Sequence, residues 1–288
     1  CPMCYTTTDE FKKNVVRTNM HFEFFKKIVD ECKKYPSHYS IRLSWRGEPF
    51  LNPHAFDMIK YAKENGIKEV STLTHGGFLD AKKFEKLVDL GLDWITISTD
   101  GVGEDYEKIR APLNFKEHVD KLKEYKKIKE EKGVVKPIIK IQGVWPAIEK
   151  SADEYYETFS PLADQVAASP LLDFLRMDNN REYLDDFTCP VLYERLTIGS
   201  DGKAYLCYND EMGSVVVGDA NDESVHDIWH GKKLEKSRKI HLKHLGVKEL
   251  APCKYCMYPR KTKKDKANVK GKSIDVDNYT NRSQTVGR

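Results

Sequence analysis

Between residues 20 and 168, the spacing of apolar positions switches repeatedly between a helical period and short apolar runs. The helical period predicts helices over residues 20–34, 53–65, 80–90, 115–132 and 152–162. The apolar runs predict strands over residues 40–45, 69–74, 93–98, 137–144 and 165–168. Strands that alternate with helices in this way are typical of βαβ units, in which a parallel sheet is covered by helices.

Five such units are too few for an eight-stranded barrel. We expect one more strand before Cys1, so the pattern predicts an α/β fold with a partial (β/α)6 TIM-like barrel over residues 1–175. In folds of this kind ligands bind where the strands end. The candidate site therefore consists of the polar residues that follow each strand.

The pattern changes after residue 175. Short segments around the turn Ser200-Asp201-Gly202 predict a β-hairpin over residues 196–206. A strand near residues 215–218 and a helix over residues 224–245 follow, so residues 176–260 form a small second domain. Residues 261–288 are polar and rich in lysine, which predicts a disordered or solvated basic tail. A role in attracting substrate is the alternative for this tail.

Composition narrows the function classes. The chain has 288 residues, with 48 Lys and Arg against 45 Asp and Glu, and this near balance argues against a nucleic-acid partner. No stretch of 18 uncharged apolar residues occurs, so we expect no membrane span. No signal peptide is visible, and we expect a cytoplasmic location. Because the first residue is Cys1, we also expect the native N-terminus to lie upstream.

Six of the seven cysteines form three pairs, whereas Cys32 has the helical spacing of a core thiol. The pairs are Cys1 with Cys4, Cys189 with Cys207, and Cys253 with Cys256. Thiolates in short loops are ligands for zinc or for iron-sulfur clusters. A structural zinc site on the last four cysteines is one alternative. A zinc ribbon that joins the first and last pairs, in a binding protein without chemistry, is another.

Three strand ends carry polar turns. In Gly47-Glu48-Pro49 a glycine lets the backbone approach a ligand, a carboxylate accepts an ammonium, and a proline fixes the turn. The alternative is that Glu48 caps the next helix. The turns Thr74-His75-Gly76 and Ser98-Thr99-Asp100-Gly101 suit a ribose or a carboxylate.

With the C-P-M-C loop ahead of this barrel pattern, the chain resembles the radical SAM superfamily. Its C-x3-C-x2-C motif holds a 4Fe-4S cluster whose open iron takes S-adenosylmethionine. Cys1 and Cys4 match the second and third cysteines of this motif. We expect its first cysteine to lie four residues upstream of Cys1. The resemblance further implies cofactor contacts for Met3, Gly47, Glu48, Pro49, Thr74, Ser98, Asp100, Gln142 and Val144.

The second domain resembles the SPASM extension of that superfamily and its shorter twitch form. Cys189, twelve residues, Gly202, four residues and Cys207 fit its C-x9-15-G-x4-C motif. Cys253 and Cys256 complete four thiolates for one auxiliary 4Fe-4S cluster, which favours twitch.

The resemblance implies reductive cleavage of S-adenosylmethionine to a 5'-deoxyadenosyl radical, with electrons from a flavodoxin- or ferredoxin-type donor. Similarity to twitch-type aminocyclitol dehydrogenases favours oxidation of a small sugar or aminocyclitol alcohol to a ketone, with the auxiliary cluster as electron acceptor. Epimerisation of the same substrate class is the next expectation. Maturation of a ribosomally made peptide, for example by thioether formation, is the alternative function. Candidate proton acceptors are Arg110, Tyr208, Asp210 and His75.

Overall fold

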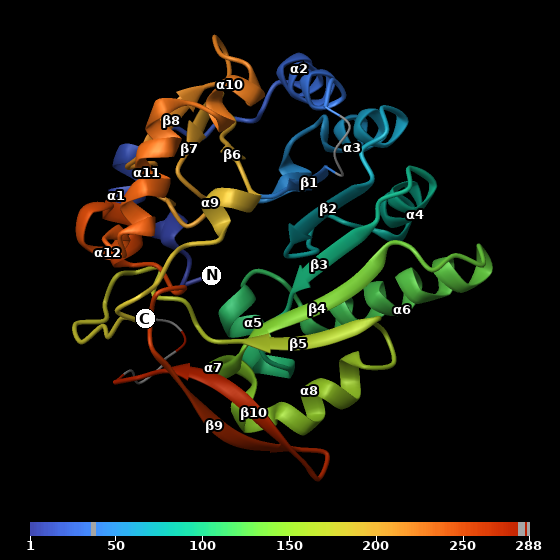
Figure 1. Cartoon of the computed structure of the whole chain (residues 1–288). Helices are drawn as coiled ribbons and strands as arrows, with labels where there is room; N and C mark the ends of the chain where they lie inside the picture. The colour runs from blue at the N-terminus through green and yellow to red at the C-terminus, as the bar shows by residue number, and fades with distance from the viewer. Residues whose placement is uncertain (36–38, 282–285, 287–288) are drawn as a thin grey trace.

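The computed structural model describes residues 1–35, 39–281 and 286. Its largest sheet is parallel throughout, with five strands in the order β1-β2-β3-β4-β5 (Figure 1). The strands are β1 (Ser40–Leu43), β2 (Glu69–Thr74), β3 (Trp94–Ser98), β4 (Ile138–Val144) and β5 (Gln165–Ser169). The sequence analysis placed all five within a few residues, and the predicted α/β class is confirmed.

Helices lie along one face of this sheet (Figure 1). The predicted ones are α2 (Phe22–Cys32), α3 (Ala55–Glu64), α4 (Ala81–Asp89), α6 (Phe115–Glu131) and α8 (Ala152–Phe159). Two short helices that the pattern did not predict are α5 (Gly103–Arg110) and α7 (Trp145–Ile148). The predicted cap of α4 is present, because the Asp80 side chain accepts a hydrogen bond from the Lys83 N–H.

Strand alternation decides which face of the sheet is apolar. Ile95 and Ile97 of β3, like Ile139 and Ile141 of β4, are buried in the core beneath the helices. The residues that alternate with these isoleucines along each strand, including Ser98 and Gln142, therefore point to the opposite face. That face holds half-buried polar side chains, which suits a ligand site better than a core.

The second domain has its own hydrophobic core and an antiparallel sheet. Its strands are β6 (Thr197–Ile198), β7 (Lys203–Tyr205) and β8 (Val216–Asp219). Its helices are α9 (Val191–Glu194), α10 (Val225–Trp229), α11 (Lys232–Leu242) and α12 (Gly246–Glu249). The single helix predicted over residues 224–245 is therefore wrong. Gly231 has extended backbone and forms the N-cap of α11, so it divides the predicted helix.

The predicted disordered tail is also wrong over most of its length. Residues 262–279 form an antiparallel hairpin of β9 (Thr262–Val269) and β10 (Lys272–Tyr279). Val269 and Val276 are buried in the barrel core, and the Lys270 N–H donates to Asp153 at the start of α8. Alternating apolar residues were hidden among lysines, which is why composition pointed to disorder. Residues 282–285, 287 and 288 of the predicted tail lie outside the described residues.

The chain begins between the barrel strands and the second domain, at the position marked N in Figure 1. The N-terminal segment comprises η1 (Tyr5–Thr7) and α1 (Asp9–Asn14). The following helix, α2, packs against both cores, with Phe25 and Val29 in the barrel core and Phe24 and Ile28 against the second. Tyr5, next to Cys4, is hydrogen-bonded to the backbone of Arg46, so the cysteine loop lies near the turn that follows β1. Within the described residues, no helix is long and apolar enough to cross a membrane.

Candidate functional site

Four cysteines come together in the second domain. Cys189, Cys207 and Cys253 are buried in its core, Cys256 is half-buried, and all four are free thiols. Burial, with a smaller contribution from neighbouring Cys189, raises the pKa of Cys256 to about 12. The pKa of Cys207 is raised by burial and by Cys256. Thiols placed this closely become thiolates when a cation compensates their charge, as a metal centre does.

Each of these sulfurs also faces an N–H donor. Backbone N–H groups of Val191 and Leu192 serve Cys189, and that of Asn209 serves Cys207. Cys256 Sγ accepts from the Asn209 side-chain amide and from the Tyr258 backbone N–H, each at 3.4 Å. Cys253 Sγ lies 3.4 Å from His241 Nε2. Donors of this kind stabilise thiolates and surround the sulfurs of iron-sulfur clusters.

Four thiolates suit a cluster that takes one at each iron. In residues 1–35, 39–281 and 286, no three His, Cys, Asp or Glu side chains are placed to hold a single metal ion. Zinc would need its sulfur ligands about 2.3 Å from one point.

The first cysteine pair lies in a tight turn at the N-terminus. The Cys4 N–H donates to the Cys1 carbonyl at 3.1 Å, and Cys4 Sγ lies 3.0 Å from Thr6 Oγ1. Cys1 is exposed and Cys4 half-buried, whereas Met3 between them is buried. Both thiols thus belong to one short loop at the end of the barrel, which suits shared ligation of a cluster.

Glu48 lies at the end of β1 and is held mainly by the next strand end. Its Oε1 accepts from Thr74 Oγ1 at 2.6 Å and its Oε2 from the His75 N–H at 3.0 Å. His75 Nε2 lies 3.4 Å from Oε2. The alternative role of Glu48 as a helix cap rests on one long hydrogen bond, which the Phe50 N–H donates to Glu48 Oε1 at 3.4 Å. The two strong contacts orient the carboxylate, and the two long ones leave it able to accept another donor.

Asp100 connects two strand ends from inside the protein. Its side chain is 1% exposed, and it accepts from the Val144 N–H at 2.8 Å and from Arg110 Nη2 at 2.5 Å. Arg110 is thus an ion-pair partner of Asp100 and has the wrong charge to accept a proton. Ser98 and Gln142 pair directly across β3 and β4, so they share the half-buried polar face. Of the predicted ribose contacts, Ser98 is therefore available and Asp100 is already engaged.

The turn after β1 also joins the barrel to the second domain. Trp45 Nε1 donates to the Tyr208 carbonyl at 2.9 Å, and Arg46 Nη2 donates to the Asp210 carbonyl at 3.1 Å. The Arg46 guanidinium stacks on Trp45 and on Tyr205, 3.7 and 4.5 Å from their ring centroids. These contacts hold the loop after Cys207 over the strand ends.

That loop contains two of the predicted proton acceptors. Asp210 is buried, and its carboxylate accepts from Ser214 Oγ and from the Ser214 and Val215 N–H groups, each at 2.8 Å. It therefore shapes the loop. The Tyr208 hydroxyl is hydrogen-bonded to the Tyr258 hydroxyl, and burial raises the pKa of Tyr208 above its usual value. A phenol with a raised pKa stays protonated near neutral pH, so it is not available to take a proton.

Glu211, which the sequence analysis missed, is the free carboxylate of this loop. Apart from its own backbone N–H, its side chain has no hydrogen-bond partner among the described residues. Burial raises its pKa to about 7, against the lowering effect of Arg176 and Arg46. It lines a pocket together with Asn209, Phe174, Arg176, Tyr255 and Cys256. No spacing rule could have found it, because most residues of this pocket come from three segments distant in the chain.

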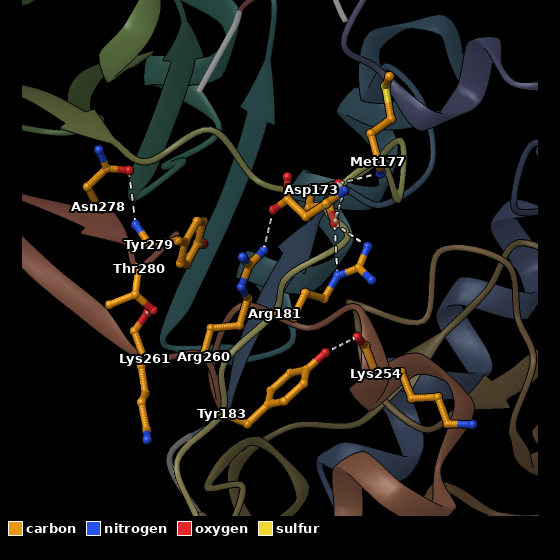
Figure 2. Close-up of polar contacts among 11 residues, drawn as sticks. Asp173, Met177, Arg181, Tyr183, Lys254, Arg260, Lys261, Asn278, Tyr279 and Thr280 are labelled. Atoms are coloured by element: carbon orange, nitrogen blue, oxygen red, sulfur yellow. Dashed lines mark hydrogen bonds and ion pairs between the residues drawn. The ribbon is translucent and has the colours of Figure 1, made fainter. Parts of the chain in front are cut away.

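Residues 172–176, which follow β5, line one side of this pocket, and Figure 2 shows the polar contacts around Asp173. Asp173 accepts from Arg181 Nε at 3.1 Å and from the Met177 N–H at 2.8 Å. The Tyr183 hydroxyl donates to the Lys254 carbonyl beside the last cysteine pair. The strand end and the second domain are thereby fixed to each other around the pocket.

Comparison with known proteins gives two family matches. The pattern of the radical SAM superfamily matches residues 1–142, and that of the SPASM iron-sulfur cluster-binding domain matches residues 189–257. Both agree with the resemblance inferred from the cysteine spacing.

The three proteins described next share less than 30% sequence identity with this chain. The chain is 27% identical over 254 residues to the tungsten-containing aldehyde ferredoxin oxidoreductase cofactor-modifying protein of Pyrococcus furiosus, covering 84% of this chain and 68% of that one. The crystal structure of BtrN in complex with AdoMet and 2-DOIA has a TM-score of 0.62 and 17% identity, over 89% and 87% of the two chains. Streptococcus suis SuiB bound to precursor peptide SuiA has a TM-score of 0.57 and 12% identity, over 88% and 70%.

Proposed function

The chain belongs to the radical SAM superfamily and carries a SPASM-type iron-sulfur domain, and from this premise we propose that it oxidises an alcohol carbon of a small polar substrate. A sugar or an aminocyclitol is the substrate class, and a ketone is the product. The observation that carries the proposal is the position of Glu211, whose carboxylate has no side-chain hydrogen-bond partner among the described residues and lies in a small pocket that Cys256 also lines.

The cofactors follow from the two domains, since a radical SAM domain binds S-adenosylmethionine with a 4Fe-4S cluster and a SPASM domain binds auxiliary clusters. We assign Cys1 and Cys4 to the first cluster. We assign one auxiliary cluster to Cys189, Cys207, Cys253 and Cys256, as in a twitch extension. When bound, these groups supply a 5'-deoxyadenosyl radical and a one-electron acceptor.

Glu48 binds the methionine ammonium of S-adenosylmethionine. Thr74 Oγ1 and the His75 N–H hold its carboxylate at the strand end, so the charge is oriented before the ligand arrives. Ser98 and Gln142 face the nucleoside from the polar side of the sheet. Asp100 and Arg110 act behind them by fixing the ends of β3 and β4.

Glu211 takes the hydroxyl proton. Oxidation of a carbinol to a ketone removes one hydrogen atom from carbon, one proton from oxygen and one electron. The Glu211 carboxylate takes the proton. The cofactor bound at Glu48 would supply the acceptor for the hydrogen atom, and the cluster that Cys189, Cys207, Cys253 and Cys256 would hold would supply the acceptor for the electron. A base beside the electron acceptor suits this step because proton loss and electron loss then occur at one place. A flavodoxin- or ferredoxin-type protein supplies the initial electron in a reducing, cytoplasmic environment.

The experiment is anaerobic turnover of candidate sugars and aminocyclitols in deuterated water. Oxidation gives one 5'-deoxyadenosine per ketone and no solvent deuterium in the product carbon. Glu211→Gln should lower ketone formation at least a hundredfold, within the range for a general base, whereas the exposed Glu154→Gln should not. Solvent deuterium on the product carbon would indicate epimerisation, and no turnover of any alcohol would contradict the substrate class.

A second candidate is radical modification of an organic cofactor or its precursor. It is favoured by the similarity to the Pyrococcus furiosus cofactor-modifying protein, which extends over 84% of this chain. Peptide maturation is the third, since SuiB, solved with its precursor peptide, shares the fold. Assays with cofactor precursors and with a short cysteine-containing peptide separate these candidates from the alcohol oxidation.

A further inference from the structure

A buried histidine outside the predicted cysteine motif contacts one of its sulfurs. His241 lies in α11 with 1% of its surface exposed, and its Nε2 is 3.4 Å from Cys253 Sγ. Its other ring nitrogen, Nδ1, is buried and has no partner among the described residues. A hydrogen on Nδ1 would be a donor without an acceptor, whereas a hydrogen on Nε2 points at the sulfur. The ring therefore presents Nε2–H to Cys253, whether it is neutral or charged.

The ring is packed tightly in this position. A Cβ added to Gly246 would lie 2.1 Å from His241 Cε1, so α12 begins with the one residue that leaves room for the ring. The carbonyl of His241 accepts from Thr188 Oγ1 at 3.1 Å, one residue before Cys189. The edge of Phe187 packs against the ring at 6.3 Å between centroids. Three segments of the second domain thus hold Nε2 against the sulfur.

We propose that His241 is a positioning and tuning residue that raises the reduction potential of the auxiliary cluster through a hydrogen bond from Nε2–H to Cys253 Sγ. The reduced cluster carries one more negative charge than the oxidised one, so its sulfurs accept the hydrogen bond more strongly. The reduced form is stabilised, and the cluster becomes a better acceptor for an electron from the substrate. This inference rests on the auxiliary ligand set proposed above.

The test is a redox titration of the auxiliary cluster alone, in the full chain with Cys1 and Cys4 both replaced by alanine. His241→Phe keeps the ring size and removes the donor. At a fixed potential it should lower the ratio of reduced to oxidised cluster about tenfold, which for one electron is a shift of about 59 mV to more negative values. His241→Gln keeps an N–H donor and should restore part of the shift.

Gly246→Ala provides an independent variant, because its added methyl group displaces the ring without changing any residue that contacts the cluster. It should shift the potential in the same direction as His241→Phe. The exposed neighbour His244, replaced by asparagine to suit its positive φ of 59°, should leave the potential unchanged.

An unchanged potential in both His241→Phe and Gly246→Ala, with four irons still bound, overturns the proposal. Loss of the auxiliary irons in His241→Phe, His241→Gln and Gly246→Ala overturns it as well, because His241 would then be needed to build the cluster. Retention of the auxiliary irons in Cys253→Ala would instead refute the ligand set, so the two failures are distinguishable.

Discussion

Replacing Glu211 with glutamine should change the stability of the protein in a pH-dependent way. Burial raises the pKa of Glu211 from 4.5 to about 7, so the folded protein binds its proton more tightly than the unfolded chain. The resulting stabilisation is fully present below pH 4.5, where both states are protonated, and is lost as the pH rises through 7. One pKa unit corresponds to about 1.4 kcal/mol, so the loss totals roughly 3 kcal/mol, of which about 2 falls between pH 5.5 and 8.5.

The assay is anaerobic urea denaturation of the wild type and of Glu211→Gln across that range. Glutamine is neutral at every pH, so the variant should gain about 2 kcal/mol relative to the wild type between pH 5.5 and 8.5. The exposed Glu154→Gln is the control and should give a difference that does not change with pH. A constant difference for Glu211→Gln would refute the burial argument, and with it the reason for expecting a base that titrates near neutrality.

The remaining predictions concern the cofactor, the domain joint and the hairpin. Glu48→Gln should weaken S-adenosylmethionine binding about 10- to 150-fold, since a hydrogen bond to a charged group contributes about 1.5 to 3 kcal/mol; an unchanged Kd in equilibrium binding would make Glu48 only a helix cap. Trp45→Phe removes the bond to the Tyr208 carbonyl and should lower the free energy of unfolding by about 1 kcal/mol; no loss in urea denaturation would show that the joint is weak. Val276→Ala should cost about 2 kcal/mol, and hydrogen exchange should show protected amides in β9 and β10; rapid exchange throughout residues 262–279 would return them to a disordered tail.

Periodicity predicted the barrel well because its strands and helices bury apolar faces at regular spacing. The five parallel strands and the helices between them lie within a few residues of the predicted ranges. The errors occurred where another signal outweighed periodicity. Lysines around Val269 and Val276 concealed the alternation of a hairpin. The hairpin is stabilised because these two valines pack into the barrel core. In the predicted helix 224–245, the break depends on the backbone at Gly231, which apolar spacing does not report.

The site was predictable where motifs are contiguous and not where segments from the whole chain converge. The cysteine spacing alone indicated the superfamily and the auxiliary domain, which the family matches confirm. The positions of Glu211 and His241 depend on tertiary contacts, because their partners lie in other segments. Asp210 had the right residue type one position before Glu211, but its own loop satisfies its carboxylate.

The central claim is that the full-length protein holds two clusters, one that has the N-terminal cysteine pair among its ligands and one on the four cysteines of the second domain. Iron and acid-labile sulfide, measured after anaerobic reconstitution of wild type and Cys253→Ala, test it directly. The account predicts about eight irons and eight sulfides in the wild type, with four per cluster, and about four of each in the variant. The variant should still form 5'-deoxyadenosine from S-adenosylmethionine. One tightly bound zinc without sulfide in the wild type, or eight irons retained in Cys253→Ala, would contradict it.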